Sequence, residues 1–312
     1  MKTRILLTAL STFCLAAAAH AQGKIEATDD AFSNIVKKNA PIEKVAGALK
    51  FTEGPLWVAE KKELWFSDIP SNRIVLWTMK PEGPMLVSFR HPSGQSNGLT
   101  LDKQGRLVAA EHANRRISRT EADGTVVTLA DKFEGKQLNS PNDVVVKSDG
   151  AIYFTDPPYG VDAKKREINF QAVWRISPDG KTLTPLVKDF KKPNGLAFSP
   201  DEKVLYVADT EGAIRAFDVA MDGSLTNDRE FAKHGGGDGM KVDVEGNVYA
   251  TGEGAVVVYD PSGKRLGKII PPEGPANCAF GGDDWKTLYM TARTGLYRVR
   301  VQIAGVKIER SN

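Results

Sequence analysis

The sequence predicts an all-β fold, a six-bladed β-propeller with four-stranded blades around a central channel. Three observations indicate it: a motif that recurs six times, a turn at a fixed place within each repeat, and an oxygen-bearing side chain that opens each repeat. The repeats start 39 to 52 residues apart, a length that suits four short strands with their turns. A linear β-solenoid is the alternative, but its coils are usually shorter than this period.

Each repeat contains the same order of elements. An acid or amide, usually followed by Gly, precedes a short apolar strand, a turn and a second strand rich in Leu, Tyr, Val and Ala. The turn residues are those that reverse a hairpin, namely Gln104-Gly105, Asp149-Gly150, Pro200-Asp201 and Glu245-Gly246. Further strands are expected over residues 73–79, 172–176, 213–219 and 255–260. We therefore expect little helix.

The ends of the chain suggest how the ring closes. Residues 44–51 and 296–303 read as the strands that join its two ends, and no linker interrupts the sequence between them. Residues 41–312 are accordingly expected to form a single propeller domain, with a short polar N-terminal arm over residues 22–40.

Residues 1–21 have the features of a cleaved secretory signal peptide. Lys2 and Arg4 precede an apolar run that ends in the small-residue site Ala19-His20-Ala21. The run is shorter than the ~20 residues that span a bilayer, so a membrane anchor is disfavoured. We expect a protein of the periplasm or a secreted protein without a membrane association. Cys278 is then its only cysteine, which excludes an intramolecular disulfide.

Composition excludes several classes of protein. Hydrophobic residues make up 41% and charged residues 26% of the chain, which argues against collagen-like, coiled-coil and disordered proteins. The formal net charge is only +3, so no basic surface for nucleic acid is indicated. A small molecule is the expected partner.

The residues that open the six repeats are expected to form a ring at one end of the channel, because rotation about one axis relates them. The ring comprises Glu53, Asn97, Asn142, Asn194, Asp238 and Asn277. All six carry a side-chain oxygen. A preference for turn residues explains one such position well, but six of six poorly, because Ser, Thr and Pro also form turns.

Carboxylate and amide oxygens favour a hard divalent cation, and Ca²⁺ is the first choice because it tolerates irregular oxygen coordination. Mg²⁺, Mn²⁺ and Zn²⁺ are the alternatives. A zinc site built on histidine or cysteine is disfavoured, since His91, His112 and His234 are not closely spaced.

Four acids end the second strand of a repeat: Asp68, Glu111, Asp156 and Asp209. They are either solvated loop acids and turn caps or groups at the channel mouth. On the second interpretation Asn97, Glu111, His112 and Asp156 are candidate substrate contacts.

Taken together, the motifs of the sequence resemble those of the gluconolactonase, or senescence marker protein (regucalcin)-like, family of six-bladed propellers. The matching motifs include FTEGPLW (51–57), SPNDVVVKSDGAIYFTDPPYG (140–160), KPNGLAFSPDEKVLYVADT (192–210) and GGGDGMKVDVEGNVY (235–249). The resemblance implies a divalent metal in the channel, most often Ca²⁺, and hydrolysis of sugar lactones. Carried over by motif, the metal ligands are Glu53, Asn142, Asn194 and Asp238. Animal members have an Arg that helps bind the sugar where this sequence has Ser140.

The hypothesis is a metal-dependent hydrolase that opens a sugar lactone. The metal polarises the lactone carbonyl, and Asp238 acts as the general base for the attacking water. A nucleophilic role for Asp238 is a variant, and His112 is a candidate for assisting proton transfer. An organophosphate hydrolase of the related propeller type and a non-catalytic binding propeller with a structural metal are the alternatives.

Overall fold

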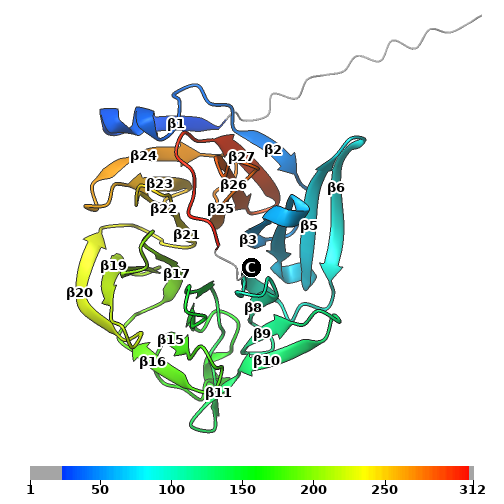
Figure 1. The fold of residues 1–312 in the computed structure, drawn as a ribbon, viewed down its shortest axis with the longest axis vertical. Helices are drawn as coiled ribbons and strands as arrows, with labels where there is room; N and C mark the ends of the chain where they lie inside the picture. Colours follow the sequence, from blue (N-terminus) through cyan, green and yellow to red (C-terminus); the bar gives the residue numbers. More distant parts are fainter. Residues whose placement is uncertain (1–22, 309–312) are drawn as a thin grey trace, which may run out of the picture.

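The computed structural model describes residues 23–308 as a ring of six antiparallel sheets around a central axis (Figure 1). The prediction of a six-bladed β-propeller is confirmed. The predicted signal peptide, residues 1–21, lies outside the described residues. Within the part of the chain that is described, no helix is long and apolar enough to cross a membrane.

The first three blades follow the predicted repeats, with strands numbered from the channel outward. The first blade contains β3 (Thr52–Val58), β4 (Glu63–Asp68), β5 (Arg73–Lys80) and β6 (Gly83–Arg90). The second contains β7 (Ser96–Leu101), β8 (Leu107–Glu111), β9 (Arg116–Thr120) and β10 (Val126–Ala130). The third contains β13 (Val144–Val146), β14 (Ile152–Thr155), β15 (Val173–Ile176) and β16 (Leu183–Val187). A small hairpin, β11 (Lys132–Phe133) with β12 (Lys136–Gln137), precedes the third blade.

The last three blades repeat the pattern. The fourth contains β17 (Pro193–Phe198), β18 (Val204–Asp209), β19 (Ile214–Val219) and β20 (Leu225–Ala232). The fifth contains β21 (Met240–Val242), β22 (Val248–Gly252), β23 (Ala255–Tyr259) and β24 (Arg265–Ile270). The sixth contains β25 (Asn277–Gly281), β26 (Thr287–Ala292) and β27 (Gly295–Arg300). The four predicted turns lie between the first two strands of their blades.

The N-terminal strand β2 (Glu43–Ala46) completes the sixth blade by pairing with β27. An ion pair between Arg298 and Glu43, 2.8 Å apart, lies at this junction. The expectation that segments from both ends of the chain close the ring is confirmed. Because this blade combines strands from both ends of the chain, the pairing ties the first and last parts of the ring together.

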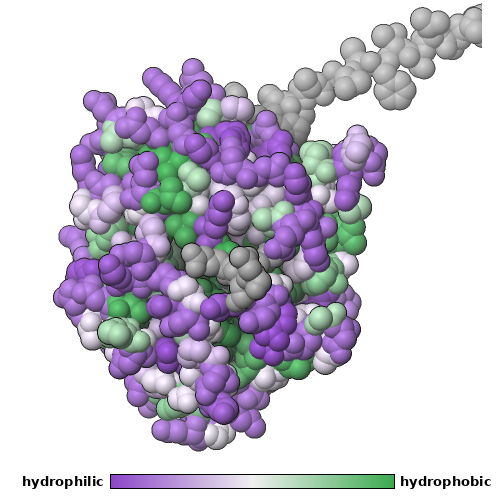
Figure 2. Space-filling model, viewed as in Figure 1, coloured by the Kyte–Doolittle hydropathy of each residue, from purple (hydrophilic) through white to green (hydrophobic). Residues whose placement is uncertain are grey.

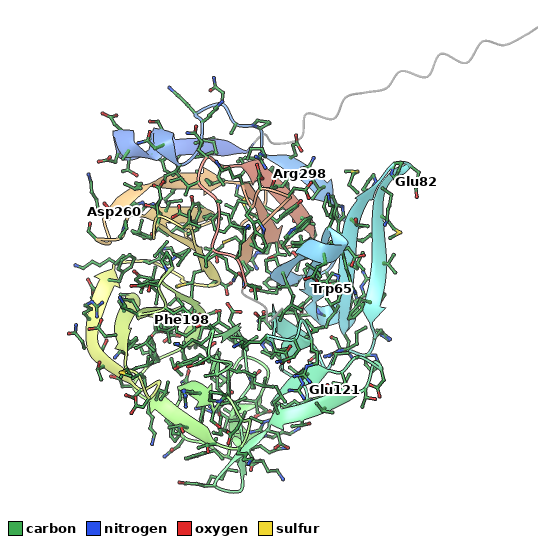
Figure 3. The ribbon with its side chains drawn as sticks, viewed as in Figure 1. Trp65, Glu82, Glu121, Phe198, Asp260 and Arg298 are labelled. Atoms are coloured by element: carbon green, nitrogen blue, oxygen red, sulfur yellow. The ribbon has the colours of Figure 1, made fainter. Side chains whose placement is uncertain are left out.

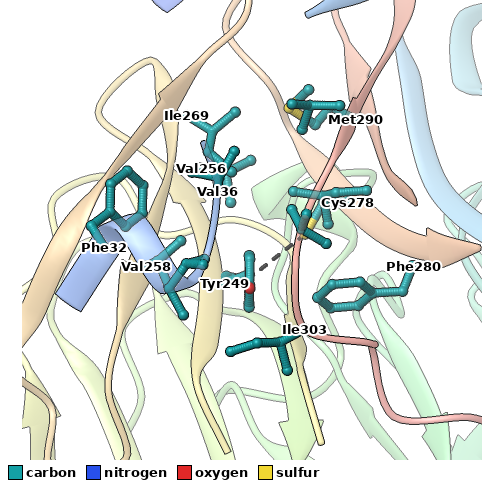
Figure 4. Packing of buried hydrophobic residues seen from close by; sticks show 14 of the residues in the cluster. Phe32, Val36, Tyr249, Val256, Val258, Ile269, Cys278, Phe280, Met290 and Ile303 are labelled. Carbon is teal, nitrogen blue, oxygen red and sulfur yellow. Dashed lines mark hydrogen bonds between the residues drawn. The ribbon is translucent and has the colours of Figure 1, made fainter. Parts of the chain in front are cut away.

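The N-terminal arm is packed on the fifth blade. Its strand β1 (Lys24–Ala27) pairs with β24, and the 3₁₀ helix η1 (Asp30–Asn34) follows. Phe32, Ile35 and Val36 are buried in the apolar cluster that joins the fifth and sixth blades, which also holds Tyr249 and Cys278 (Figure 4). The other short helices are η2 (Ala59–Lys61), η3 (Ile69–Ser71) and η4 (Ala163–Lys165).

Aromatic side chains fill the space between blades. Trp57 of the first blade stacks on Tyr289 of the sixth, with ring centroids 5.7 Å apart. Polar residues such as Glu82 and Asp260 lie at the outer edge of the ring (Figure 3). The rim of the face seen in Figure 2 is mainly hydrophilic. Large apolar faces are therefore buried between the blades, which gives the inner strands a rigid frame.

The end of the channel opposite the ring residues is crossed by the C-terminal segment, which runs to the middle of the ring in Figure 1. Val306 N–H donates to the carbonyl of Val242, and Gly305 N–H donates to that of Trp285. A cavity of about 340 Å³ lies here, lined mainly by apolar residues and by residues 306–308. None of the six ring residues lines it, so this cavity is separate from the candidate site.

Candidate functional site at the mouth of the channel

The six ring residues lie at or just before the start of the innermost strands, so the rotation of the blades gathers them at one end of the channel. Glu53, Asn97, Asn142, Asn194 and Asn277 are each at most 5% exposed, and Asp238 is partly buried. The structure therefore brings together the residues that the repeats predicted as a ring.

Backbone contacts hold consecutive ring residues against each other. Gly98 N–H donates to the carbonyl of Asn142 at 2.7 Å, and Gly195 N–H donates to that of Asp238 at 3.0 Å. A β-carbon at position 195 would lie 2.2 Å from the Asp238 carbonyl oxygen. The glycine that follows a ring residue is thus required for the close approach of the next blade.

Two carboxylates from blades separated by only one other blade meet at the mouth. Asp238 of the fifth blade lies in hydrogen-bonding contact with Glu53 of the first. Burial and the adjacent Asp238 raise the pKa of Glu53 well above its usual range. Burial and the nearby Asp143 raise the pKa of Asp238 to about 7. A pair of this kind retains a proton or requires a cation.

Asp143 is a third buried carboxylate, which the sequence reasoning did not single out. Its Oδ1 accepts from Val144 N–H at 2.9 Å, while its Oδ2 has no hydrogen-bond partner within residues 23–308. Burial raises the pKa of Asp143, and Lys241 opposes this shift. Three acids within one buried region give the mouth a strongly negative potential.

The ring asparagines differ in which amide atom is already used. Asn277 Oδ1 accepts from Cys278 N–H at 2.9 Å, and its side chain contacts both Glu53 and Asp143. Asn194 Nδ2 donates to Thr210 Oγ1 at 3.2 Å, and Asn194 also contacts Asp238. Asn97 Nδ2 lies 3.4 Å from His112 Nε2. The amide oxygen of Asn277 is therefore already engaged by a backbone N–H, although its side chain lies next to the acids. The amide oxygen of Asn194 remains available as a ligand.

The acids that end the second strands hold the segments leading to the ring residues in three blades. Asp156 accepts from Asn139 N–H at 2.7 Å and from Ser140 N–H at 2.6 Å. Asp68 accepts from the amides of residues 50 and 51, and Asp209 from those of residues 191 and 192. Asp156 is fully buried, and burial raises its pKa to about 7. Asp156 thus faces the backbone two to three residues before Asn142.

Glu111 points into the frame where the second blade meets the first. Its carboxylate accepts from Arg90 at 2.7 Å, Arg116 at 2.7 Å, Ser118 at 2.5 Å and Asn114 at 2.5 Å. All of its oxygen capacity is used in this network. The structure therefore does not bring Glu111 to the ring, whereas the adjacent His112 does contact Asn97.

The residues at the mouth fit a hard divalent cation. In the described part of the chain no group of three or more His, Cys, Asp or Glu side chains is arranged to hold a metal, so any site must combine acids with amides. Glu53 and Asp238 are oxygen donors whose proximity is unfavourable without a positive charge between them. Asn194 and Asn142 add amide oxygens on the same ring, a donor set suited to Ca²⁺.

Two residues at the mouth were missed by the sequence reasoning, Tyr159 and Thr210. Tyr159 lies on the loop between β14 and β15, and its hydroxyl donates to Thr210 Oγ1 at 2.7 Å. Thr210 in turn donates to the carbonyl of Gly237 at 2.8 Å. The one signal in the sequence that could have identified Thr210 is that it directly follows the strand-end acid Asp209. No comparable signal in the 157–171 loop identifies Tyr159.

The fold and the site define a class of protein, the six-bladed propellers with an oxygen-rich channel mouth. The chain belongs to the SMP-30/gluconolactonase/LRE-like family, whose model matches residues 51–294. It is 34% identical to a protein named gluconolactonase from Zymomonas mobilis, over 91% of this chain and 87% of that protein. A pentonolactonase from Haloferax volcanii is 28% identical over 78% of this chain and 81% of its own length.

Solved structures agree with this placement. A structure described as a gluconolactonase from Xanthomonas campestris superposes with a TM-score of 0.82 at 34% identity, covering 90% of this chain and 95% of that one. The named activities of these relatives are hydrolyses of lactones.

Proposed function

We propose that the protein is a metal-dependent lactonase that opens a sugar lactone, as gluconolactonases do. The observation that carries the proposal is the contact between the carboxylates of Glu53, which is buried, and Asp238, which is partly buried, at a mouth lined with amides. The relatives named gluconolactonase and pentonolactonase support a sugar lactone as the substrate class.

Glu53, Asn142, Asn194 and Asp238 are the residues that would hold the cation, with Ca²⁺ as the first choice and Mg²⁺, Mn²⁺ or Zn²⁺ as alternatives. When bound, a divalent cation supplies Lewis-acid polarisation of a carbonyl oxygen. The two carboxylates balance its charge, so a neutral lactone can enter the site without an electrostatic penalty.

Asp238 is the general base in this proposal. Its carboxylate takes a proton from the attacking water, whose oxygen adds to the lactone carbonyl carbon. The ring carbon–oxygen bond then breaks, and the proton passes to the released alkoxide to give the hydroxy acid. A bound dication favours the ionised carboxylate of Asp238, which is the form that accepts the proton.

The substrate is expected to contact the side of the mouth formed by Asn97 and His112. For Asp156 and Glu111 the geometry favours structural roles, because the oxygens of Asp156 accept from groups of its own blade and those of Glu111 from groups of the first and second blades. Ser140 stands where the animal relatives have a sugar-binding Arg, and its hydroxyl accepts from Gly160 N–H at 2.9 Å. Recognition of the sugar therefore differs from that of the animal proteins.

The predicted signal peptide supports export, so we propose that the lactonase acts in the periplasm or outside the cell on a small-molecule substrate. The near-neutral charge balance gives no support to nucleic-acid binding.

The test is a hydrolysis screen of the chain that follows residue 21, after chelation and readdition of single cations. Gluconolactone and pentonolactones are the substrates, and paraoxon-type esters are the competing class. We expect lactone hydrolysis that disappears on chelation and returns with Ca²⁺, with Glu53→Gln as the inactive control. Hydrolysis of the phosphotriesters alone, or cation binding without any hydrolysis, would contradict the proposal.

A further inference from the structure

The hydroxyl group of Thr210 joins three blades beside the candidate site. Thr210 lies directly after β18 in the fourth blade. It accepts from Tyr159 of the third blade at 2.7 Å and from Asn194 Nδ2 of its own blade at 3.2 Å. It donates to the carbonyl of Gly237, which precedes Asp238 in the fifth blade, at 2.8 Å. One oxygen atom is thus bound by three partners.

The chemistry of these partners fixes the direction of each hydrogen bond. A backbone carbonyl can only accept, so the single hydroxyl proton of Thr210 is committed to Gly237. The Thr210 oxygen can then only accept, and Asn194 must turn its NH₂ group toward it. The amide oxygen Oδ1 of Asn194 is the atom that remains for the site.

We propose that Thr210 is a positioning residue that sets the amide of Asn194 as an oxygen donor, and that Tyr159 fastens the 157–171 loop to the same hydroxyl. This inference rests on the proposed function, since it assigns Asn194 as a ligand. It adds two residues that the repeat pattern of the ring does not contain.

The second blade supports the inference, because the rotation that relates the blades places His112 at the position equivalent to Thr210. His112 follows the strand-end acid Glu111 as Thr210 follows Asp209, and its Nε2 lies 3.4 Å from the amide nitrogen of Asn97. Equivalent positions in two blades thus contact the amide nitrogen of the ring asparagine. In the third blade this position is Pro157, whose side chain cannot make such a bond.

The backbone around Thr210 is held independently of its hydroxyl. Thr210 N–H donates to the carbonyl of Lys192 at 3.0 Å, and Asp209 accepts from the amides of Lys191 and Lys192 at 2.9 Å each. A Thr210→Val substitution, which has nearly the same shape, should therefore fold and change mainly the hydrogen bonds of the side chain.

Tyr159 is placed to couple the loop to the mouth. It is 43% exposed, and the adjacent Gly160 N–H is bound by Ser140 Oγ. The loop is thus fastened at two neighbouring points, Ser140 of its own blade and Thr210 of the next. Loss of the Tyr159 hydroxyl should loosen the loop while leaving the bond from Asn194 to Thr210 in place.

Calcium titration calorimetry on the chelator-treated chain, together with kcat and KM for gluconolactone, tests both parts. Removing the partner that orients a ligand typically weakens metal binding about 10- to 100-fold, and we expect this loss in Thr210→Val. Thr210→Ser keeps the hydroxyl and should restore affinity to within about threefold of wild type. Tyr159→Phe should raise KM with little change in Ca²⁺ affinity.

The matched control is Thr226→Val on β20, because Thr226 is an exposed threonine of the same blade far from the mouth. If Thr210→Val binds Ca²⁺ as tightly as Thr226→Val does, the assignment of Thr210 is overturned. If Tyr159→Phe leaves KM unchanged, the assignment of Tyr159 is overturned. If the wild type binds Ca²⁺ but opens no lactone, the proposed function fails while calorimetry still decides on Thr210. If no divalent cation binds, both fail.

Discussion

The carboxylates of Glu53 and Asp238 lie in hydrogen-bonding contact although they belong to the first and fifth blades. Within residues 23–308 neither carboxylate forms an ion pair with a basic side chain. Closure of the ring brings them together, because each lies at or just before the start of the inner strand of its blade. The energy of blade packing thus supports an electrostatically unfavourable pair, which a cation or a proton relieves.

The raised pKa values predict that protons and cations compete for this pair. In the metal-free protein the folded state keeps a proton on Asp238 up to about pH 7, whereas an unfolded Asp loses it near pH 4. Stability of the metal-free protein should therefore fall as pH rises between these values. We expect Ca²⁺ to raise the melting temperature more at about pH 8 than at about pH 5.5.

Thermal unfolding with Ca²⁺ or chelator at several pH values measures this effect. Asp238→Asn is the control, since it removes one titrating group, and its melting temperature should depend less on pH. An equal Ca²⁺ shift at both pH values in the wild type would show that the pair is not where the cation binds.

Substitution of the two carboxylates should separate binding from catalysis. Glu53→Gln removes a charged ligand, and both Ca²⁺ affinity and turnover should fall. Asp238→Asn keeps one side-chain oxygen for the cation, so we expect measurable Ca²⁺ binding with kcat reduced by about 10²- to 10⁴-fold, the range for loss of a general base. Calorimetry and steady-state kinetics on the same preparations check this. Retention of most activity in metal-loaded Asp238→Asn would mean that another group takes the proton.

The fold was predictable because its signal is local and repeated. The expected strand over residues 73–79 is β5 at Arg73–Lys80, and that over 255–260 is β23 at Ala255–Tyr259. The ring was predictable for the same reason, since one position in six copies defines one circle. The N-terminal arm was expected to be polar, yet Phe32 and Val36 are buried, because their partners lie on β23 and β24, far along the chain.

The side-chain contacts around the ring were harder to predict from the sequence. A strand-end acid such as Glu111 has the same local pattern as Asp156, but Arg90 of β6 reaches it only after the first two blades pack together. The contact between Tyr159 and Thr210 likewise joins two loops of different blades. Side-chain direction at such sites depends on partners distant in sequence, which a local pattern does not encode.

Glu111→Gln tests whether this acid is structural. The substitution leaves Arg90, whose side chain is 11% exposed, without its buried counter-charge, and breaking such a pair costs about 3–5 kcal/mol. We expect lower stability in chemical denaturation and an unchanged KM for the lactone in the folded fraction. Glu121→Gln in the same blade, whose partners Arg106 and Arg119 are more exposed, is the control and should change stability little. A raised KM with full stability would instead place Glu111 in the substrate site.

Asp156→Asn tests whether Asp156 holds the backbone segment that leads to Asn142. The amide can satisfy only one of the two N–H groups of Asn139 and Ser140 and turns its own NH₂ group toward the other. Leaving a buried donor unsatisfied costs about 1–3 kcal/mol, so unfolding by denaturant should shift accordingly. Ca²⁺ affinity should also fall, since the segment leads to a proposed ligand. Asp179→Asn in an exposed turn is the control, and equal behaviour of the two variants would count against a supporting role.

His112 provides the last test, because its environment separates a neutral contact from a proton carrier. Burial lowers the pKa of His112 to about 4, so the imidazole is neutral throughout the neutral range. Its Nε2 lies beside Asn97 Nδ2, and a β-carbon at Gly160 would lie 2.8 Å from its Cβ, so the ring is packed beneath the loop. The kcat/KM profile should therefore lack a histidine limb near pH 6.5. His112→Gln, which keeps a polar contact to Asn97, should retain kcat within about tenfold, whereas loss of a proton carrier costs about 10²- to 10⁴-fold. A larger loss of kcat in a folded, Ca²⁺-binding variant would show that His112 transfers a proton.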